Sequence, residues 1–348
     1  MADLKELLAK RSQGLKPTAT TVRKRDGTVT IERAAVAGLS EAEQRERMEA
    51  SQRASKAAEK VEIKPYSEGI LYGYQGEEGN WKPWEGDRET MAADPGDGLR
   101  VMTFNIWFSP HEWEKRADML LDLLFAGDAY DVVMLQEVTK RFLGRLTADS
   151  RVRQRYVVTD TSGGTFIGGY GNMMLIRREL PRPAIWFVKF PGRMGRRGLV
   201  ATFENVALAT VHLESLNSTR LRLEQLNRLC EVLDQPVAVI AGDFNVAGTG
   251  PYASAAEDTA VDAVRSQYGF DDVCAELGLT YDTRESANTM VRAADDQPID
   301  YARYDRVWVR GGLAADRQLV GADGADGLWI SDHFGLSFVV SRKSVTSK

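Results

Sequence analysis

The chain has 348 residues, of which 43% are hydrophobic, so it can form one large domain or two modest ones with a real core. Its two cysteines, Cys230 and Cys274, exclude a cysteine zinc site and argue against a disulfide scaffold, so we expect an intracellular, nuclear or cytoplasmic protein. The net charge is -5, and residues 1–64 hold 14 Lys or Arg against 10 Asp or Glu, whereas the remainder holds 31 against 40. The acidic charge of residues 65–348 argues against a protein that coats nucleic acid non-specifically, and it fits an enzyme whose carboxylates bind metal.

The first part of the chain is polar. Residues 1–64 are rich in Ala, Glu, Lys and Arg, and we expect a flexible tail there, although residues 4–10 and 40–60 could be helical. No apolar run approaches the ~18 residues of a membrane span, and the first residues lack the apolar core of a signal peptide. The sequence therefore predicts no membrane partner.

Residues 65–96 form an aromatic and glycine-rich extension, which we expect to pack on the main domain and to bury its large rings there. Its aromatic residues are Tyr66, Tyr72, Tyr74, Trp81 and Trp84. The turn cluster at residues 95–98 is a good boundary, so the main domain is predicted to cover residues 97–342, followed by a tail at 343–348.

A regular pattern of strands and helices begins at residue 99. Apolar runs predict strands at residues 99–105, 131–136, 155–159, 172–176, 184–190, 199–203, 206–212, 237–242, 306–309 and 334–340. Helices are predicted at residues 112–125, 139–148 and 218–233. Many strands with fewer helices predict an α/β fold, specifically a four-layer α/β sandwich of two packed, mostly antiparallel sheets flanked by helices.

Polar side chains stand at the ends of six of these strands. They are Asn105, Glu137, His212 with Glu214, Asp243 with Asn245, Asp305, and the run Ser331-Asp332-His333. Each alone has a structural explanation, such as a turn or a hydrogen-bonded histidine. Because strands of one sheet place their ends side by side, we expect these groups to share one pocket.

The chemistry of this set favours a metal-assisted reaction on phosphate. Carboxylate and amide oxygens without cysteine suit Mg²⁺, or Mn²⁺, better than zinc. A metal ion can neutralise phosphate charge while a carboxylate activates water and an imidazolium holds developing charge. The set therefore suits hydrolysis of a phosphate ester.

The ordered motifs TFN, LQEV, HLES, GDFN and SDHFGL resemble those of the endonuclease/exonuclease/phosphatase superfamily of Mg²⁺-dependent phosphodiesterases, over roughly residues 97–342. Within the superfamily the chain is most similar to the tyrosyl-DNA phosphodiesterases. This similarity rests on HLES followed by Arg220 and Gln225, on residues 280–283 (TYDT) and on residues 304–307 (YDRV).

The resemblance implies roles at the metal and at the attacking water. Glu137 is expected to be the principal Mg²⁺ ligand. Asp332 would lie near the metal or its waters, and Asn105 would contact the water shell of the metal and the phosphate. Asp243 would orient and deprotonate the attacking water, with Asn245 beside it holding the phosphate.

The resemblance also implies roles around the phosphate. His333 would stabilise the transition state as a hydrogen-bond donor, with His212 acting from another side. Asp305, rather than the adjacent Asp332, would hydrogen-bond His333 and keep it cationic, while Ser331 would be a structural partner.

Four residues are expected to contribute to substrate binding. Tyr281 stands where relatives carry a tryptophan and could stack on a base or sugar. Arg196 and Arg197 could supply positive charge, unless they belong to a solvated loop. Glu214 is expected to orient neighbouring residues or loops.

The resemblance implies hydrolysis of the 5′-phosphotyrosyl bond between a DNA end and a topoisomerase-type peptide. The expected partners are single-stranded DNA 5′ ends with peptide adducts, with RNA-linked peptides as a further candidate, and the protein is expected to be a monomer. The alternatives are another DNA or RNA nuclease, a lipid-headgroup phosphodiesterase, or a binding protein with a decayed site. The last alternative predicts the loss of metal or histidine positions, all of which are present.

Overall fold

A computed structural model of the chain describes residues 19–23, 29–33, 66–76, 79–86, 98–284 and 300–342. The chain divides into two units, Met1–Lys64 and Pro65–Lys348. In the first unit β1 (Ala19–Arg23) and β2 (Val29–Arg33) pair antiparallel. The helices considered for residues 4–10 and 40–60, and the tail at 343–348, lie outside the described residues.

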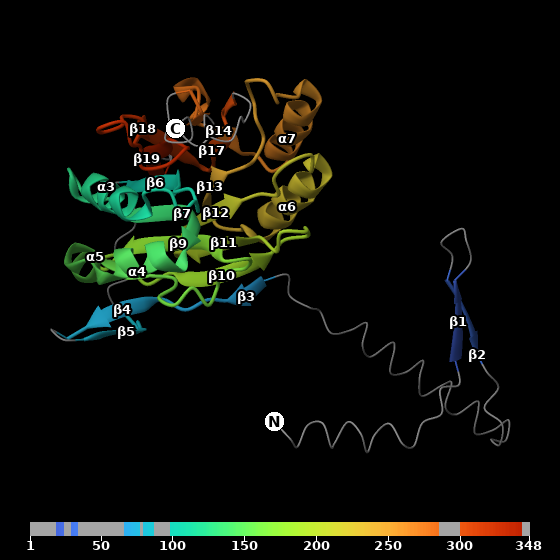
Figure 1. The fold of residues 1–348 in the computed structure, drawn as a ribbon, viewed down its shortest axis with the longest axis horizontal. Coiled ribbons are helices and arrows are strands. Elements are labelled where there is room, and N and C mark those ends of the chain that lie inside the picture. Colours follow the sequence, from blue (N-terminus) through green and yellow to red (C-terminus); the bar gives the residue numbers. More distant parts are fainter. Residues whose placement is uncertain are drawn as a thin grey trace, which may run out of the picture. The chain divides into compact units, whose positions relative to one another are not determined.

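The second unit is built on two large sheets that lie against each other (Figure 1). The seven-stranded sheet runs in the order β14 (Asp271–Asp272), β17 (Asp305–Arg310), β13 (Val237–Asp243), β12 (Val206–His212), β11 (Arg197–Thr202), β10 (Ala184–Lys189), β3 (Tyr66–Glu68). The eight-stranded sheet runs in the order β18 (Gly312–Val320), β19 (Gly335–Arg342), β6 (Leu99–Asn105), β7 (Val132–Thr139), β9 (Tyr170–Arg177), β8 (Tyr156–Val158), β4 (Tyr72–Gln75), β5 (Asn80–Pro83). In the described part of the chain, β6–β7 and β12–β13 are the parallel neighbours in these sheets.

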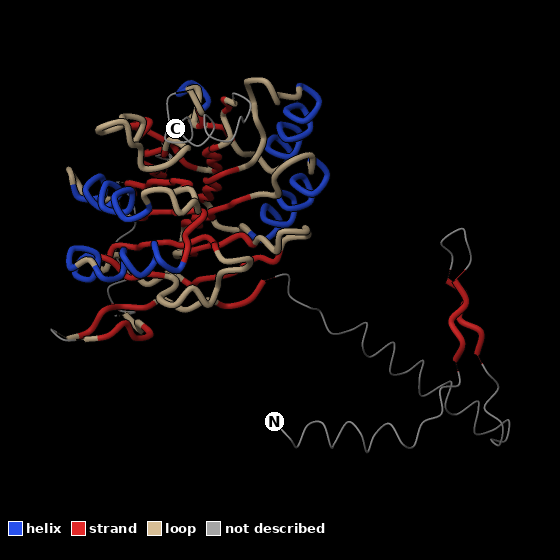
Figure 2. Tube along the Cα trace, in the orientation of Figure 1, coloured by secondary structure: helices blue, strands red, loops and turns tan. Residues whose placement is uncertain are grey.

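Helices cover both outer faces, which Figure 2 shows in blue. The outer face of the eight-stranded sheet carries α3 (Trp113–Phe125), α4 (Lys140–Ala148) and α5 (Ser150–Arg155). The outer face of the seven-stranded sheet carries α6 (Thr219–Val232) and α7 (Ala255–Gln267). The predicted four-layer sandwich of two mostly antiparallel sheets flanked by helices is confirmed.

The core occupies three layers because the central strands are buried on both faces. Along β7, Val132 and Met134 face the other sheet, whereas Val133 and Leu135 face the helices. This alternation follows from the two-residue period of a strand, whose successive side chains point to opposite faces. Strands covered on both sides read as continuous apolar runs, and such runs made the central strands visible in the sequence.

The aromatic extension supplies edge strands to both sheets. β3 pairs with β10, and β4 pairs with β8 and β5. The ring of Tyr66 meets Trp186 edge-on at 5.0 Å, and the indole N–H of Trp81 donates to the carbonyl of Thr147 at 3.1 Å. These rings are half-buried against the sandwich. The predicted boundary at residues 95–98 falls almost entirely outside the described residues.

The sequence did not predict α5, α7, β14, β18 or the short pair β15 (Tyr281–Asp282) and β16 (Tyr301–Ala302). α7 buries only Val261 and Val264, so its apolar stripe is weak, and β18 is an edge strand whose side chains are mostly exposed. Periodicity cannot detect elements that bury so little. Both cysteines are buried and free. Among the described helices, none has the length and apolar character that crossing a membrane requires.

Candidate active site

The polar strand ends meet at one edge of the sandwich because of strand pairing. His212 and Asp243 are paired in the parallel β12–β13 register, and Asp243 is paired with Asp305 across β13–β17. In the facing sheet Asn105 ends β6, while His333 lies just before β19, the antiparallel neighbour of β6. The structure thus brings together groups that lie more than 200 residues apart in the sequence.

Glu137 reaches this edge through an irregularity in β7. The β7–β9 register shifts between Leu135 and Val138, and Glu137 has φ 60, in the left-handed region. Such a bulge re-aims a side chain and is common beside active sites. Glu137 Oε2 accepts the backbone N–H of Phe108 at 2.8 Å. Left-handed backbone at non-glycine residues costs about 1–3 kcal/mol each, so Trp107 (φ 57) and Asn245 (φ 52) add further strain at the same place.

Gly242 explains why the GDFN motif begins with glycine. Its φ is 137, and a Cβ atom at this position would stand 2.2 Å from the carbonyl oxygen of Val211. No residue with a Cβ atom fits so close to the neighbouring strand. The glycine therefore lets β12 and β13 approach each other just before His212 and Asp243.

A carboxylate–imidazole cluster lies at the centre of the edge. The ligand atoms of Glu137, His212 and Asp243 all lie within 4.8 Å of one another. His212 Nε2 is 3.4 Å from Asp243 Oδ2 and 3.7 Å from Glu137 Oε1. Asn105 donates its Nδ2–H to Asp243 Oδ2 at 3.0 Å, and its own oxygen accepts the N–H of Trp107. These groups, apart from the slightly more open Glu137, are at most 4% exposed.

His333 is held by the partner that the sequence analysis expected. Its Nδ1 lies 2.8 Å from Asp305 Oδ2, and its Nε2 lies 3.9 Å from Asp243 Oδ2. Ser331 is a structural partner, since its hydroxyl donates to the carbonyl of Asn105 at 2.6 Å and accepts the N–H of His333 at 3.2 Å. Burial opposes the charge on His333, but Asp305 outweighs it and raises the pKa of the imidazole to about 10.

The electrostatics of the cluster favour a bound cation. Burial, followed by the charge of Asp332, raises the pKa of Glu137 to about 7, and burial also raises the pKa of Asp332. Burial lowers the pKa of His212 to about 3, so this imidazole is neutral and can ligate or donate. Buried carboxylates whose pKa values are raised in this way are destabilised as anions unless a positive charge lies near them.

Glu137 belongs both to the predicted metal ligands and to the Glu137–His212–Asp243 cluster. The sequence analysis assigned Asp332 and Asn105 to the metal side. Among the His, Cys, Asp and Glu side chains of the described residues, His212 and Asp243 form with Glu137 a group whose ligand atoms could hold a metal ion. Asp332 is 7% exposed and lines the same cleft as Glu137 and Asp243. Its predicted role at the metal or its waters stays a prediction.

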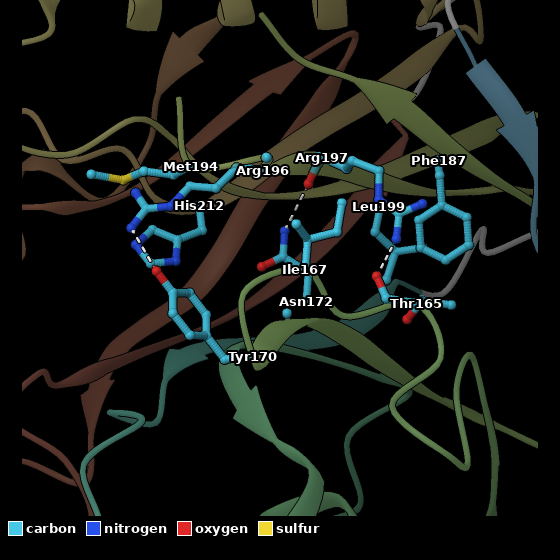
Figure 3. Close-up of a pocket in the computed structure, with 12 residues that line it drawn as sticks. Thr165, Ile167, Tyr170, Asn172, Phe187, Met194, Arg196, Arg197, Leu199 and His212 are labelled. Atoms are coloured by element: carbon cyan, nitrogen blue, oxygen red, sulfur yellow. Dashed lines mark hydrogen bonds between the residues drawn. The ribbon is translucent and has the colours of Figure 1, made fainter. Parts of the chain in front are cut away.

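The predicted substrate residues fall into two groups. Tyr281 and Arg196 line a cleft of about 1030 Å³ that contains Glu137, Asp243 and His333. Tyr281 meets the His333 ring edge-on at 5.0 Å. In the small pocket of Figure 3, the Arg196 guanidinium lies beside His212 and donates to the Tyr170 hydroxyl at 3.3 Å.

Arg197 and Glu214 have mainly structural contacts. Arg197 donates to the carbonyl of Thr165, away from His212 (Figure 3), and its own carbonyl accepts from Asn172. Glu214 is 1% exposed and accepts the N–H of Arg193 at 2.8 Å, while its own N–H donates to Gln225. These contacts fit the loop-orienting role expected for Glu214, and its contact with substrate stays a prediction.

Two buried arginines were missed. Arg116 is fully buried on α3 and donates to five backbone carbonyls of the described residues, namely those of Ile106, Trp107, Ser109, His111 and Ile330. Arg222 on α6 is 3% exposed and holds the loop after β12. Each lies on the apolar face of its helix, and an arginine at such a position is the sequence feature that could have revealed it as a buried structural residue.

The comparisons with known proteins concern the family and the fold. A family model described as the endonuclease/exonuclease/phosphatase family matches residues 102–333, so the chain belongs to this family and is a phosphodiesterase or nuclease by class. Among solved structures, TDP2 of D. rerio complexed with a single-strand DNA product is similar, with a TM-score of 0.56 and 25% identity, covering 70% of this chain and 99% of that chain. TDP2 from C. elegans shares the fold, with a TM-score of 0.52 and 18% identity over 71% of this chain and 76% of its own. No curated protein matches the sequence.

Proposed function

We propose that this protein is a divalent-metal-dependent phosphodiesterase that hydrolyses the 5′-phosphotyrosyl bond joining a single-stranded DNA end to a topoisomerase-type peptide. The observation that carries the chemistry is the juxtaposition of the Glu137–His212–Asp243 cluster with the Asp305-paired His333 in one cleft. The substrate rests on the likeness to tyrosyl-DNA phosphodiesterase 2, because TDP2 of D. rerio was crystallised with a single-strand DNA product. Peptides linked to RNA are a further candidate substrate.

The donor set fits Mg²⁺ or Mn²⁺. Glu137, Asp243, Asp332 and Asn105 offer oxygen ligands, which these hard cations prefer, and the described residues near them include no thiol. We assign the ion to Glu137, with Asp332 and Asn105 on its ligand or water side. When bound, the ion would supply Lewis-acid polarisation of the phosphate and would neutralise the buried carboxylates.

Asp243 is the residue placed to activate water. Its Oδ1 accepts the N–H of Asn245 at 2.8 Å and its Oδ2 accepts from Asn105, so the carboxylate is fixed in orientation. A carboxylate held in this way can take a proton from a water molecule as that water attacks phosphorus. The Asn245 Nδ2 donates to the carbonyl of Leu213 at 3.0 Å, and its second N–H can point to a phosphate oxygen.

His333 and His212 act on the phosphate oxygens in different charge states. His333 keeps its proton because of Asp305 and presents a cationic Nε2–H at the cleft. His212 is neutral and serves as a hydrogen-bond donor or ligand. Donors fixed before the reaction stabilise the negative charge that develops on a pentacovalent phosphate, and each is worth about 10²–10³-fold in rate.

The test uses the purified full chain with Mg²⁺ and four substrates in parallel: 5′-phosphotyrosyl single-stranded DNA, abasic duplex DNA, RNA and a phospholipid with a charged headgroup. We expect release of tyrosine with a 5′-phosphate left on the strand. Glu137→Gln and Asp243→Asn should lower kcat by about 10²–10⁴-fold. Glu179→Gln, at a side chain that is 66% exposed and outside the cleft lining, is the matched control.

Two outcomes would contradict the proposal. Cleavage of another substrate without release of tyrosine would reassign the substrate and leave the site chemistry intact. Full activity of both Glu137→Gln and Asp243→Asn on every substrate would overturn the site itself.

A further inference from the structure

Three large apolar side chains that line the catalytic cleft are exposed, namely Phe108 beside Glu137 and the pair Leu216 and Tyr252 on the rim. Leu216 is 82% exposed and Tyr252 is 56% exposed, and both line the cleft together with Asp243 and His333. A single exposed leucine is ordinary on a protein surface. Leu216, however, also has φ 62, a left-handed conformation that branched side chains rarely adopt. Folding therefore holds this residue in a strained and solvated state instead of burying it.

A buried ion pair maintains this strained conformation. Arg222, which is 3% exposed, donates from Nη1 to the carbonyls of Glu214 and Leu216, both at 2.8 Å. Its Nε donates to Glu257 Oε1 at 2.7 Å. The carbonyl of Leu216 also accepts the N–H of Ser218 at 2.8 Å. The Leu216 side chain is thus presented to the cleft by contacts that fix only its backbone.

The same ion pair fixes the segment that carries Tyr252. Leu216 lies just before Ser218, the N-terminal cap of α6, and Tyr252 lies just before Ser254, the cap of α7. Arg222 is in the first turns of α6, and Glu257 is in the first turn of α7. Their pairing joins the two helix starts, so both apolar side chains stand at the same arm of the cleft.

We infer that Leu216 and Tyr252 form an apolar rim that contacts the bases of a single strand beyond the nucleotide that carries the scissile phosphate. A phenol ring stacks on any base, and an aliphatic side chain packs on a base face, so the contact would be tolerant of sequence. The other polar groups of this arm include Asn217 and Thr219, which are neutral donors suited to phosphate oxygens, and the one carboxylate, Glu257, is neutralised by Arg222. The inference rests on the proposed function, because it assumes a strand in this cleft.

Binding of a product strand tests the rim without requiring turnover. The probes are 5′-phosphorylated thymidylates of one and six nucleotides, measured with Mg²⁺ by fluorescence anisotropy and competition. Leu216→Asn removes the apolar surface but keeps a residue that tolerates the left-handed conformation, and Tyr252→Ala removes the ring. Each should raise Kd for the six-nucleotide strand about 10-fold, as expected for loss of one stacking or packing contact, and leave the one-nucleotide Kd unchanged.

Leu313→Asn is the matched control, because Leu313 is 53% exposed on β18 and lies outside the cleft lining. Its Kd values should equal those of the wild type, and the melting temperature of Leu216→Asn should not fall. The inference is overturned if neither rim variant weakens binding of the six-nucleotide strand, or if both weaken binding of the one-nucleotide probe to the same extent. It is likewise overturned if the variants weaken binding of a phosphotyrosyl peptide and not of the strand. It is also overturned if wild-type affinity does not grow with strand length. The cleavage assay with the four substrates tests the proposed function separately, whatever the binding experiment shows.

Discussion

Replacement of Arg116 tests whether a buried guanidinium organises the catalytic loops. Its five N–H donors reach backbone carbonyls at 2.9–3.2 Å: His111 from Nε, Ile106 and Ile330 from Nη1, Trp107 and Ser109 from Nη2. A buried acceptor left without a partner costs about 1–3 kcal/mol. Since water can enter and repay part of this cost, we expect Arg116→Met to lower the free energy of unfolding by about 3–5 kcal/mol.

The same substitution should also lower the rate in molecules that remain folded. The carbonyls bound by Arg116 flank Phe108, whose N–H holds Glu137, and Ile330 immediately precedes the SDH motif. A displacement of about 1 Å in such supports can cost roughly 10²-fold in kcat. Arg116→Lys keeps the charge but has only three donors, so it should recover stability only in part.

Urea denaturation and kcat on the cleaved substrate are the two measurements. Lys115→Met is the matched control, because its side chain is 72% exposed on the same helix and pairs with the exposed Glu112. The control should change stability by less than about 0.5 kcal/mol. A loss below about 1 kcal/mol for Arg116→Met, with normal kcat, would refute the reasoning, because it would mean that the five carbonyls need no fixed donor.

Three other predictions concern the site and the core. Gly242→Ala should cost about 3 kcal/mol or more of unfolding free energy because its Cβ would meet backbone 2.2 Å away, whereas Gly144→Ala, with nothing within 4 Å, should be neutral or stabilising. Asp305→Asn should lower kcat at neutral pH about 10²-fold or more, because His333 loses the charge that raises its pKa to about 10; unchanged kcat would count against a cationic His333. Burial raises the pKa of both cysteine thiols to about 12, so a disulfide reagent at pH 8 should label them only when the protein unfolds. A pH above about 9 should destabilise the fold, because the thiols ionise in the unfolded chain and not in the folded one. Rapid labelling of the native protein would contradict this prediction.

The sequence was most informative where burial is greatest. Two central strands, β6 and β12, were predicted with the bounds that the structure shows. Their apolar runs are long because both faces are covered. β18 and α7 were missed for the opposite reason, since an element that is mostly exposed leaves little apolar periodicity to detect.

Within the candidate site, the sequence indicated the residue types and several contacts. The pairing of Asp305 with His333, rather than of Asp332 with its neighbour His333, was expected and is present at 2.8 Å. The position of His212 between two carboxylates was not expected, because it depends on the β7 bulge at Glu137 and on the β12–β13 register. Neither of these can be read from the order of residues.

By itself, the sequence determined the sandwich class, the family motifs and the oxygen-rich set of polar residues, because apolar runs and short motifs are local properties of the chain. Only the tertiary structure decided which atoms meet. The register of neighbouring strands aligns His212, Asp243 and Asp305, and buried Arg116 and Arg222 fix loops through backbone carbonyls that carry no sequence signal. Distances of a few ångströms between groups from separate strands are set by packing, and these distances decide the chemistry.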